Sequence, residues 1–182
     1  MKDKPTTIHW ETLGSEQGED LVIFKARYDT VQNPRNNKQL RAVVLESNDS
    51  AATIALTRNE QVLMIRQHRF GISGESLEIP GGFVDAGEDS LTAAQRELQE
   101  ETGFTSDDWQ YLGFVYSNPV FMNSKVHYWL ARHVEKTKTV APDEGEALQL
   151  EVYPIFKIKE LLNDGTITVS YTHLTLPTIC SV

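Results

Sequence analysis

The sequence predicts an α/β domain that follows a small N-terminal antiparallel β hairpin. Short runs rich in β-branched and aromatic residues, bounded by turn residues, predict strands, and two longer segments of helix-forming residues predict helices. The predicted helices lie at residues 93–101 and 154–162. The strands predicted for the domain lie at residues 51–56, 61–66, 111–117, 125–133 and 148–153.

The hairpin is predicted from two strand-like runs near the start of the chain. Residues 21–28 and 40–46 are both rich in β-branched and aromatic residues, and the turn cluster Gln-Asn-Pro-Arg-Asn-Asn at 32–37 separates them. We expect residues 1–48 to form a β subdomain that serves dimerisation, and residues 49–168 to form the catalytic domain. The alternative is that the two runs are simply further strands of one core.

Composition restricts the class of protein. The 182 residues, 40% hydrophobic and 24% charged, suit one globular domain with a substantial core. A net charge of −9 argues against a partner held through nucleic-acid phosphates. The first residues lack an apolar run and no 18-residue apolar segment follows, so we expect no secretory signal, no membrane partner and a cytoplasmic location. The single cysteine, Cys180, excludes an internal disulfide framework.

The most informative stretch is residues 82–104, which read GFVDAGEDSLTAAQRELQEETGF. It fits Gly-x5-Glu-x7-Arg-Glu-aliphatic-x-Glu-Glu-x-Gly-aliphatic at every literal position, with Phe104 in the last apolar slot. Each literal position matches by chance with a probability of about 0.05–0.1, so coincidence is negligible. Asp89 or Ser90 suits a helix N-cap, and Gly103 suits the left-handed position at a helix end.

The helix predicted in this stretch carries three carboxylates on one face. Glu97, Glu100 and Glu101 are related by i,i+3 and i,i+4 spacings, and no lysine at i+4 offsets their repulsion. A divalent cation would relieve that repulsion, and Mg2+ suits a few carboxylates combined with substrate phosphates. A solvated acidic helix face is the alternative for such a run taken alone. With the complete pattern around it, the run predicts a metal site.

Residues 82–104 resemble a complete Nudix box, the signature of hydrolases that act on nucleoside diphosphates linked to another moiety. The resemblance implies the Nudix fold, an α/β/α sandwich with a mixed central sheet, and a Mg2+ cofactor for which Mn2+ is an alternative. It implies that Glu97 and Glu101 are the central metal ligands, that Glu100 shares a metal and that the Gly81 carbonyl contributes an oxygen.

Two other residues of the box are expected to orient these ligands. By the same resemblance, Arg96 holds the helix carboxylates in place through a charge-assisted fork and so belongs to the catalytic set. Glu88 is expected to belong to that orienting network.

A second acidic element follows the box. Residues 143–146 read Asp-Glu-Gly-Glu and are similar to a D-E-x-E element that the family carries on a loop. The resemblance makes Glu144 the general base and Glu146 an additional metal ligand. Whether Glu144 or a box glutamate such as Glu100 is the base stays open, and an ordinary polar turn is the alternative for this loop.

The residues before and after the box resemble one branch of the family. The strand end Gln-His-Arg at 67–69, followed by Glu-Ile-Pro-Gly at 78–81, is similar to the ADP-ribose and nucleotide-sugar pyrophosphatases. Pro119, sixteen residues after Gly103, is placed as in the ADP-ribose pyrophosphatases. The Val-Phe-Met-Asn that follows departs from their usual Gly-Phe-Ser-Asp/Glu, so a nucleotide hexose is as well supported as ADP-ribose.

Several residues are candidates to bind such a substrate, Pro119 among them. Arg69 and Arg41 are expected to clamp the diphosphate or the terminal ribose, and the Glu78 carboxylate to receive a sugar hydroxyl. Phe24 or Tyr28, in the N-terminal hairpin, is expected to stack on the base, although aromatic residues on strands more often serve packing.

The expected reaction is Mg2+-dependent hydrolysis of a nucleoside diphosphate sugar, such as ADP-ribose or an ADP- or GDP-hexose, to a nucleoside monophosphate and a sugar phosphate. One alternative is a Nudix hydrolase of nucleoside triphosphates or dinucleoside polyphosphates. Another is a non-catalytic module that binds a nucleotide sugar. In this branch the N-terminal strands commonly exchange between subunits, so a homodimer is expected.

The end of the chain has an unusual composition. Residues 169–182 show no helix pattern and resemble peptides produced when vector or adapter DNA is read as coding sequence. We expect this segment to be a non-native tail; a native short β tail is the alternative.

Overall fold

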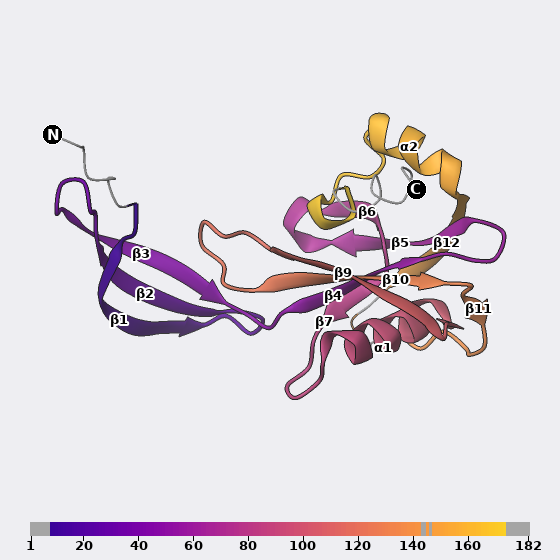
Figure 1. Cartoon of the computed structure of the whole chain (residues 1–182), viewed down its shortest axis with the longest axis horizontal. Helices are drawn as coiled ribbons and strands as arrows, with labels where there is room; N and C mark the ends of the chain where they lie inside the picture. The colour runs from indigo at the N-terminus through magenta and orange to yellow at the C-terminus, as the bar shows by residue number, and fades with distance from the viewer. Residues whose placement is uncertain (1–7, 143–144, 146, 174–182) are drawn as a thin grey trace, which may run out of the picture. The chain divides into compact units, whose positions relative to one another are not determined.

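The computed structural model describes residues 8–142, 145 and 147–173. The chain forms two compact units, one of residues 1–47 and 116–124 and the other of residues 48–115 and 125–182. Figure 1 follows the elements of both units along the chain.

The first unit is built on an antiparallel sheet of order β1-β2-β3. Its strands are β1 (Glu11–Asp20), β2 (Lys25–Gln32) and β3 (Gln39–Glu46). The pairing of β2 with β3 is continuous from Lys25 with Glu46 to Gln32 with Gln39, which confirms the predicted antiparallel hairpin and its turn.

Two details of the first unit differ from the prediction. The predicted strand at 21–28 begins only at Lys25, because Leu21 donates to the carbonyl of Phe24 and Val22 has a left-handed φ of 72°. In addition, β1 pairs with β2 although all ten of its residues are exposed. Its Glu, Gly and Ser residues give no strand pattern, so only the pairing with β2 makes it a strand.

The second unit contains two larger sheets and a two-stranded ribbon. The four-stranded sheet has the order β7-β4-β10-β9, the three-stranded sheet the order β12-β5-β6, and the ribbon joins β11 to β8. In the four-stranded sheet β4 and β10 run parallel, whereas β7 is antiparallel to β4. Their bounds are β4 (Ser50–Ala55), β5 (Gln61–Arg69), β6 (Gly74–Glu78), β7 (Gly81–Phe83), β8 (Phe104–Thr105), β9 (Asp108–Tyr116), β10 (Lys125–Arg132), β11 (Glu135–Lys136) and β12 (Leu148–Pro154).

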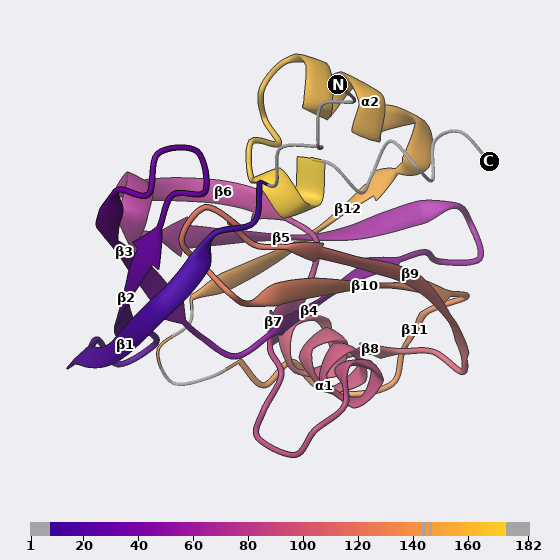
Figure 2. The same cartoon turned by 60° about the vertical axis from the view of Figure 1, so that its left-hand side comes forward.

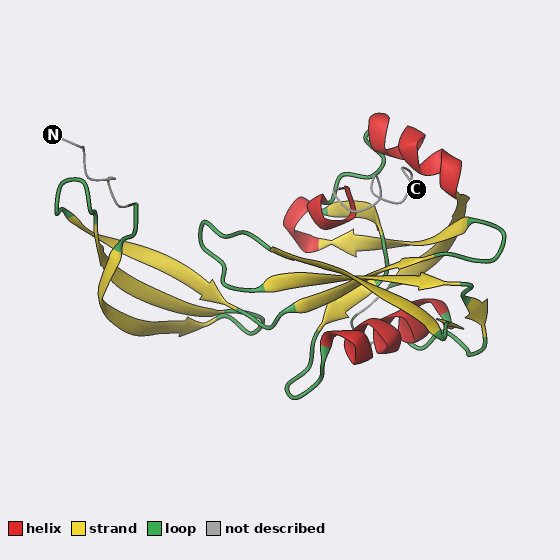
Figure 3. Ribbon diagram, in the orientation of Figure 1, coloured by secondary structure: helices red, strands yellow, loops and turns green. Residues whose placement is uncertain are grey.

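Two helices enclose the sheets of the second unit. The strands lie between α1 (Ser90–Thr102) and α2 (Ile155–Asn163), as both Figure 1 and Figure 2 show. Figure 3 separates the two helical layers from the strands by colour; a short 3-10 helix, η1 (Phe70–Ile72), connects β5 to β6. This arrangement is the predicted α/β/α sandwich with a mixed sheet.

The core of the second unit is centred on its inner strands. Residues 51–55 of β4 and 62–65 of β5 are buried, which explains why both appear in the sequence as short apolar runs. On the side of α1, Ala93 and Ala94 pack against Ala51, and their small side chains allow the helix to approach the sheet closely. Within the described residues, no helix is long and apolar enough to span a membrane.

The segment after α2 packs on the second unit as far as it is described. Residues 170–173 form a helical turn, in which His173 donates to the carbonyl of Val169. Thr172 is fully buried, and its Oγ1 accepts a 3.3 Å hydrogen bond from the Ile79 backbone. The sequence pattern indicated no helix here. The non-native origin of residues 169–182 stays a prediction, and residues 174–182 lie outside the described part.

Candidate active site

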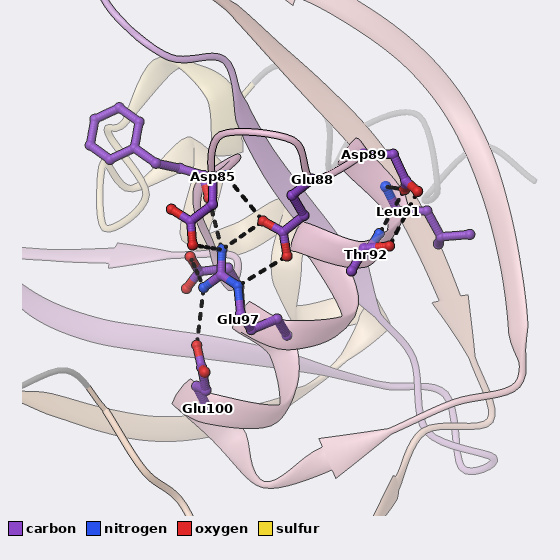
Figure 4. A network of polar contacts seen from close by, with 9 residues as sticks. Asp85, Glu88, Asp89, Leu91, Thr92, Glu97 and Glu100 are labelled. Atoms are coloured by element: carbon purple, nitrogen blue, oxygen red, sulfur yellow. Dashed lines mark hydrogen bonds and ion pairs between the residues drawn. The ribbon is translucent and has the colours of Figure 1, made fainter.

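Helix α1 presents the box carboxylates because both of its ends are fixed. Asp89 is the N-cap, and its Oδ1 accepts hydrogen bonds of 2.9 Å from the backbone of Leu91 and Thr92 (Figure 4). At the other end Gly103 adopts a left-handed φ of 75° and donates to the carbonyl of Gln99. These are the two caps expected from the sequence, with Asp89 rather than Ser90 at the N-terminus.

The guanidinium of Arg96 is the centre of the site. Its Nε and Nη2 donate to the two oxygens of Glu88 at 3.2 Å, and its Nη1 donates to Glu97 at 2.9 Å and to Glu100 at 3.1 Å. Figure 4 shows these three carboxylates converging on one guanidinium. Nη2 also donates to the carbonyl of Phe83 at 2.9 Å, which fixes the guanidinium to β7.

Two box carboxylates, Glu101 and Glu97, lie against the Gly-Gly segment at the start of β7. Glu101 is 2% exposed, and its Oε2 accepts a 2.9 Å hydrogen bond from the Gly81 backbone. The carboxylate of Glu97 lies so close to Gly82 that an added Cβ there would fall 2.2 Å from its Oε1. A side chain at position 82 would therefore displace the Glu97 carboxylate from this place, which gives the first literal residue of the box a physical reason.

The electrostatics of this cluster are unbalanced. The fork to Arg96 is the largest cause that lowers the pKa of Glu88, and the hydrogen bond from the Asp85 backbone adds to it. Conversely, the hydrogen bond to Glu88 and the charges of its neighbours raise the pKa of Arg96 further above its ordinary value. One guanidinium thus faces three hydrogen-bonded carboxylates, with Asp85 a further 4.0 Å contact. Among the described residues that these contacts join, negative charge is in excess of positive charge.

The donor set has the chemistry of a hard-cation site. Every candidate ligand on α1 is a carboxylate, and oxygen ligands suit Mg2+ or Mn2+. Glu97 and Glu100 reach the same Arg96 nitrogen within 3.1 Å, so the structure brings them to one place. Within the described residues, however, no three His, Cys, Asp or Glu side chains are arranged to hold an ion. The ligand roles of Glu97, Glu100, Glu101 and the Gly81 carbonyl stay predictions, while the residue types fit the metal.

The predicted general base and the additional ligand belong to the D-E-x-E element at residues 143–146. Glu144 and Glu146 lie outside the described residues, so the structure tests neither role. The network does include Asp85 and the Phe83 carbonyl, which sequence reasoning missed. Both occupy variable positions of the pattern, so only their distance to Arg96 marks them.

Arg69 and Glu78 form a bidentate ion pair with each other. Arg69 Nε and Nη2 donate to the two oxygens of Glu78 at 2.8 and 2.6 Å, and Ser76 donates to Oε1 as well. Glu78 is fully buried, whereas the side chain of Arg69 is 43% exposed and also donates to the hydroxyl of Tyr171 at 3.1 Å. The substrate-binding roles of Arg69 and Glu78 stay predictions.

The remaining substrate-binding candidates belong to the first unit. The guanidinium of Arg41 lies 3.7 Å from the ring centroid of Tyr28, and the Tyr28 hydroxyl donates to Glu19 at 3.0 Å. Phe24 is half-buried in the loop before β2. Pro119 is exposed in a turn in which Phe121 donates to the carbonyl of the preceding asparagine. The structure brings Arg41 and Tyr28 together; their roles stay predictions.

The match to a family model decides the relationship. A model of the NUDIX domain matches residues 47–171. The chain belongs to the Nudix family. The match includes α1 with all its carboxylates, and it extends three residues into the segment 169–182.

This Nudix chain is similar to several known proteins over most of its length. An ADP-ribose pyrophosphatase of Mycobacterium tuberculosis is 31% identical over 163 residues, which cover 88% of this chain and 78% of the relative. A methanol dehydrogenase activator of Bacillus methanolicus is 29% identical over 172 residues, covering 90% and 92%. The crystal structure of an ADP compounds hydrolase superimposes on this chain with a TM-score of 0.84 at 21% sequence identity. The superposition covers 94% of this chain and 92% of the chain of the hydrolase, and it confirms the fold.

The family match and the complete box together identify the chain as a Nudix hydrolase. Its similarity to relatives such as the Mycobacterium enzyme supports the ADP-ribose pyrophosphatase branch that the sequence resembles.

Proposed function

We propose that the chain hydrolyses the pyrophosphate bond of a nucleoside diphosphate sugar in the presence of Mg2+. The products are a nucleoside monophosphate and a sugar phosphate. The observation that carries the proposal is the excess of negative charge around Arg96, where one guanidinium holds three carboxylates on a helix that is fixed at both ends. A structural ion-pair cluster would not need this surplus, whereas a site for a divalent cation does.

The substrate class follows from the relatives rather than from the geometry. The Mycobacterium relative is named an ADP-ribose pyrophosphatase, and it matches most of this chain. ADP-ribose and an ADP- or GDP-hexose are therefore the first substrates to test. Mn2+ is the metal to compare with Mg2+, because both take oxygen ligands.

The site residues are proposed to have three roles: to hold the metal, to orient its ligands and to accept a proton from water. Glu97, Glu100 and Glu101, with the Gly81 carbonyl and Glu146, would hold Mg2+, which when bound lowers the pKa of water and neutralises charge on the diphosphate. Arg96 and Glu88 keep the carboxylates of α1 in position. Either Glu144 or Glu100 takes the proton from the attacking water, whose oxygen bonds to one phosphorus. The bond from that phosphorus to the bridging oxygen breaks, and the other phosphate leaves with that oxygen.

Substrate recognition is assigned to residues outside the box. Arg69 is proposed to contact the diphosphate through its exposed edge, because Glu78 occupies its other edge. A role of Glu78 toward a sugar hydroxyl competes with that pair. Arg41 is proposed to bind an anionic group, and Phe24 or Tyr28 to stack on a base. Substitution of a true substrate contact raises KM.

The decisive experiment measures phosphate release in a phosphatase-coupled assay with Mg2+. The substrates are ADP-ribose, ADP-glucose, GDP-mannose, UDP-glucose, ATP and a dinucleoside polyphosphate, with Glu101→Gln and an EDTA-treated sample as controls. Turnover of the diphosphate sugars that disappears in both controls supports the proposal. Preference for ATP or the polyphosphate contradicts the substrate class but keeps the metal site. Tight binding without any turnover contradicts catalysis and supports a binding module.

We also propose that the protein is a homodimer formed through the first unit. Its loop 21–23 exposes Leu21, Val22 and Ile23 by 49–96%, and large apolar side chains this exposed favour a protein interface. Light scattering measures the mass in solution. A value near that of one 20.6 kDa chain, at micromolar concentration, contradicts the dimer.

A further inference from the structure

A cavity in the second unit lies at the carboxyl ends of the two parallel strands β4 and β10. Its volume is about 660 Å3, within the usual size of small-molecule sites. Ligands of α/β proteins commonly bind outside the carboxyl ends of parallel strands. The residues that line it come from the β4–β5 turn, the end of β10 and α2, and are Leu56, Thr57, Arg58, Glu60, Leu130, Arg132, His133, Ile155, Phe156 and Lys159.

This cavity is separate from the box. Gly81, at the box, pairs with Ala52 on β4, and Leu56 follows four residues further along the same strand direction. At about 3.3 Å per residue the two places are about 13 Å apart. A ligand in the cavity therefore does not occupy the carboxylate site.

The frame of the cavity is built by backbone hydrogen bonds. Leu56 donates to the carbonyl of Ala131 at 2.8 Å and accepts from Val134 at 2.9 Å, which ties the ends of β4 and β10 together. Ile155 donates to the carbonyl of Glu60 at 2.9 Å, which ties the start of α2 to the β4–β5 turn. These hydrogen bonds hold together the three segments that line the cavity, which are the β4–β5 turn, the end of β10 and the start of α2.

The side chains that line the cavity include cationic and apolar residues. Arg58, Arg132 and Lys159 bring three positive charges to one cavity of a protein whose net charge is −9. Arg58 is partly neutralised by Glu135 at 3.1 Å and Arg132 by Asp108 at 3.8 Å, whereas Lys159 makes no ion pair within the described residues. An anion near Lys159 would restore the charge balance.

The apolar and aromatic residues of the lining indicate which chemical groups the rest of an anionic ligand contains. Leu56, Leu130 and Ile155 form the apolar part of the lining, and Phe156 is 80% exposed, so its ring is free to stack on a planar group. Glu60 adds an acceptor for hydroxyl or amino hydrogens and disfavours a polyanion. A single phosphate joined to a hydroxylated and planar body matches this combination.

We propose that this cavity is a second binding site, for a nucleoside monophosphate. Lys159 and the two arginines bind the phosphate, Phe156 stacks on the base and Glu60 accepts a hydrogen bond from the ribose. The site does not depend on hydrolysis at the box. Should the proposed reaction hold, its nucleotide product would be a natural occupant.

Calorimetric titration of AMP into the full chain tests the site. The titration uses the Glu101→Gln variant in EDTA, so that binding is read without turnover or metal. Lys159→Glu in this background should weaken AMP binding about tenfold or more, because it reverses a charge facing the phosphate. Phe156→Ala should weaken it about fivefold or more. Lys157→Glu is the matched control, since Lys157 pairs with Glu160 and does not line the cavity; it should leave AMP binding unchanged.

Competitors determine which part of the ligand is recognised. Adenosine and inorganic phosphate should each compete at least tenfold more weakly than AMP. AMP binding that survives both Lys159→Glu and Phe156→Ala overturns the site, as does the absence of AMP binding at millimolar concentration. Inorganic phosphate that competes as well as AMP overturns the nucleotide assignment. Turnover of diphosphate sugars by Lys159→Glu should stay within about twofold of the unsubstituted chain, so loss of hydrolysis and loss of this site remain distinguishable.

Discussion

Arg96 and Arg69 both bind carboxylates of the second unit, but in different ratios. Among the described residues, the carboxylate that Arg69 is seen to bind is Glu78, which is fully buried and held through both oxygens. Arg96 meets three, and these are partly accessible to solvent. A buried carboxylate that is paired through both oxygens needs no further cation, whereas a cluster with surplus negative charge is stable only with a further cation or with water around it. Within the described residues, the ratio of charges therefore distinguishes the Arg69–Glu78 pair from the proposed metal site around Arg96.

The largest expected effect is loss of activity at the unbalanced cluster. Glu97→Gln removes a proposed metal ligand without changing the shape of the side chain, and kcat/KM should fall about 1,000-fold, about 4 kcal/mol. The phosphatase-coupled assay measures it. Glu75→Gln is the matched control, since Glu75 is exposed on β6 and should retain full activity. Retention of activity by Glu97→Gln would remove the basis for the metal site.

The next effect concerns the balanced pair. Arg69→Met leaves the buried Glu78 carboxylate without its main partner and should lower the free energy of unfolding by about 3–5 kcal/mol. Thermal unfolding should show a Tm lower by roughly 6–20 °C. The double variant Arg69→Met/Glu78→Gln should recover much of the loss. If Arg69→Met instead keeps its Tm and only raises KM, Arg69 acts mainly on the substrate.

A smaller loss of activity is expected when Arg96, at the centre of the carboxylate cluster, is replaced. Arg96→Lys keeps the charge but loses the fork, so Glu88, Glu97 and Glu100 are no longer held together. Activity should fall about 10- to 100-fold, as for other residues that orient metal ligands. Raising the Mg2+ concentration should recover part of it. An unchanged kcat/KM would show that the fork does not position the carboxylates.

The smallest effect is a pH dependence at a second balanced pair, Arg66 with Glu151. The hydrogen bond from Arg66 is the largest cause that lowers the pKa of Glu151 from its ordinary 4.5, although burial opposes it. A lowered folded-state pKa stabilises the fold above pH 4.5, and that stability is lost as the pH falls through the lowered value. The contribution is about 1 kcal/mol, or about 2–4 °C in Tm. Thermal unfolding from pH 7 to 3 should show a smaller acid loss for Glu151→Gln than for the unsubstituted chain.

The sequence by itself determined the elements with strong local signals. The box predicted α1, both of its caps and the shared face of its carboxylates, because capping, glycine and i,i+4 rules act within a few residues. Apolar runs located β4, β5 and β10, because these strands are buried and so must be apolar. The hairpin of β2 and β3 followed from its turn residues.

Only the tertiary structure determined the strand pairing, the side-chain partners and the cavity that residues far apart in the chain form together. Strand β1 exists because β2 offers a pairing edge, not because of its own residues. Arg69 was predicted to bind substrate, yet only folding shows that Glu78 from β6 and Tyr171 from the helical turn at residues 170–173 already occupy part of it. The cavity at the ends of β4 and β10 likewise draws on three separate segments, none of which carries a motif. Local rules fix backbone conformation and the face of a helix, whereas pairing and burial depend on which distant residues meet.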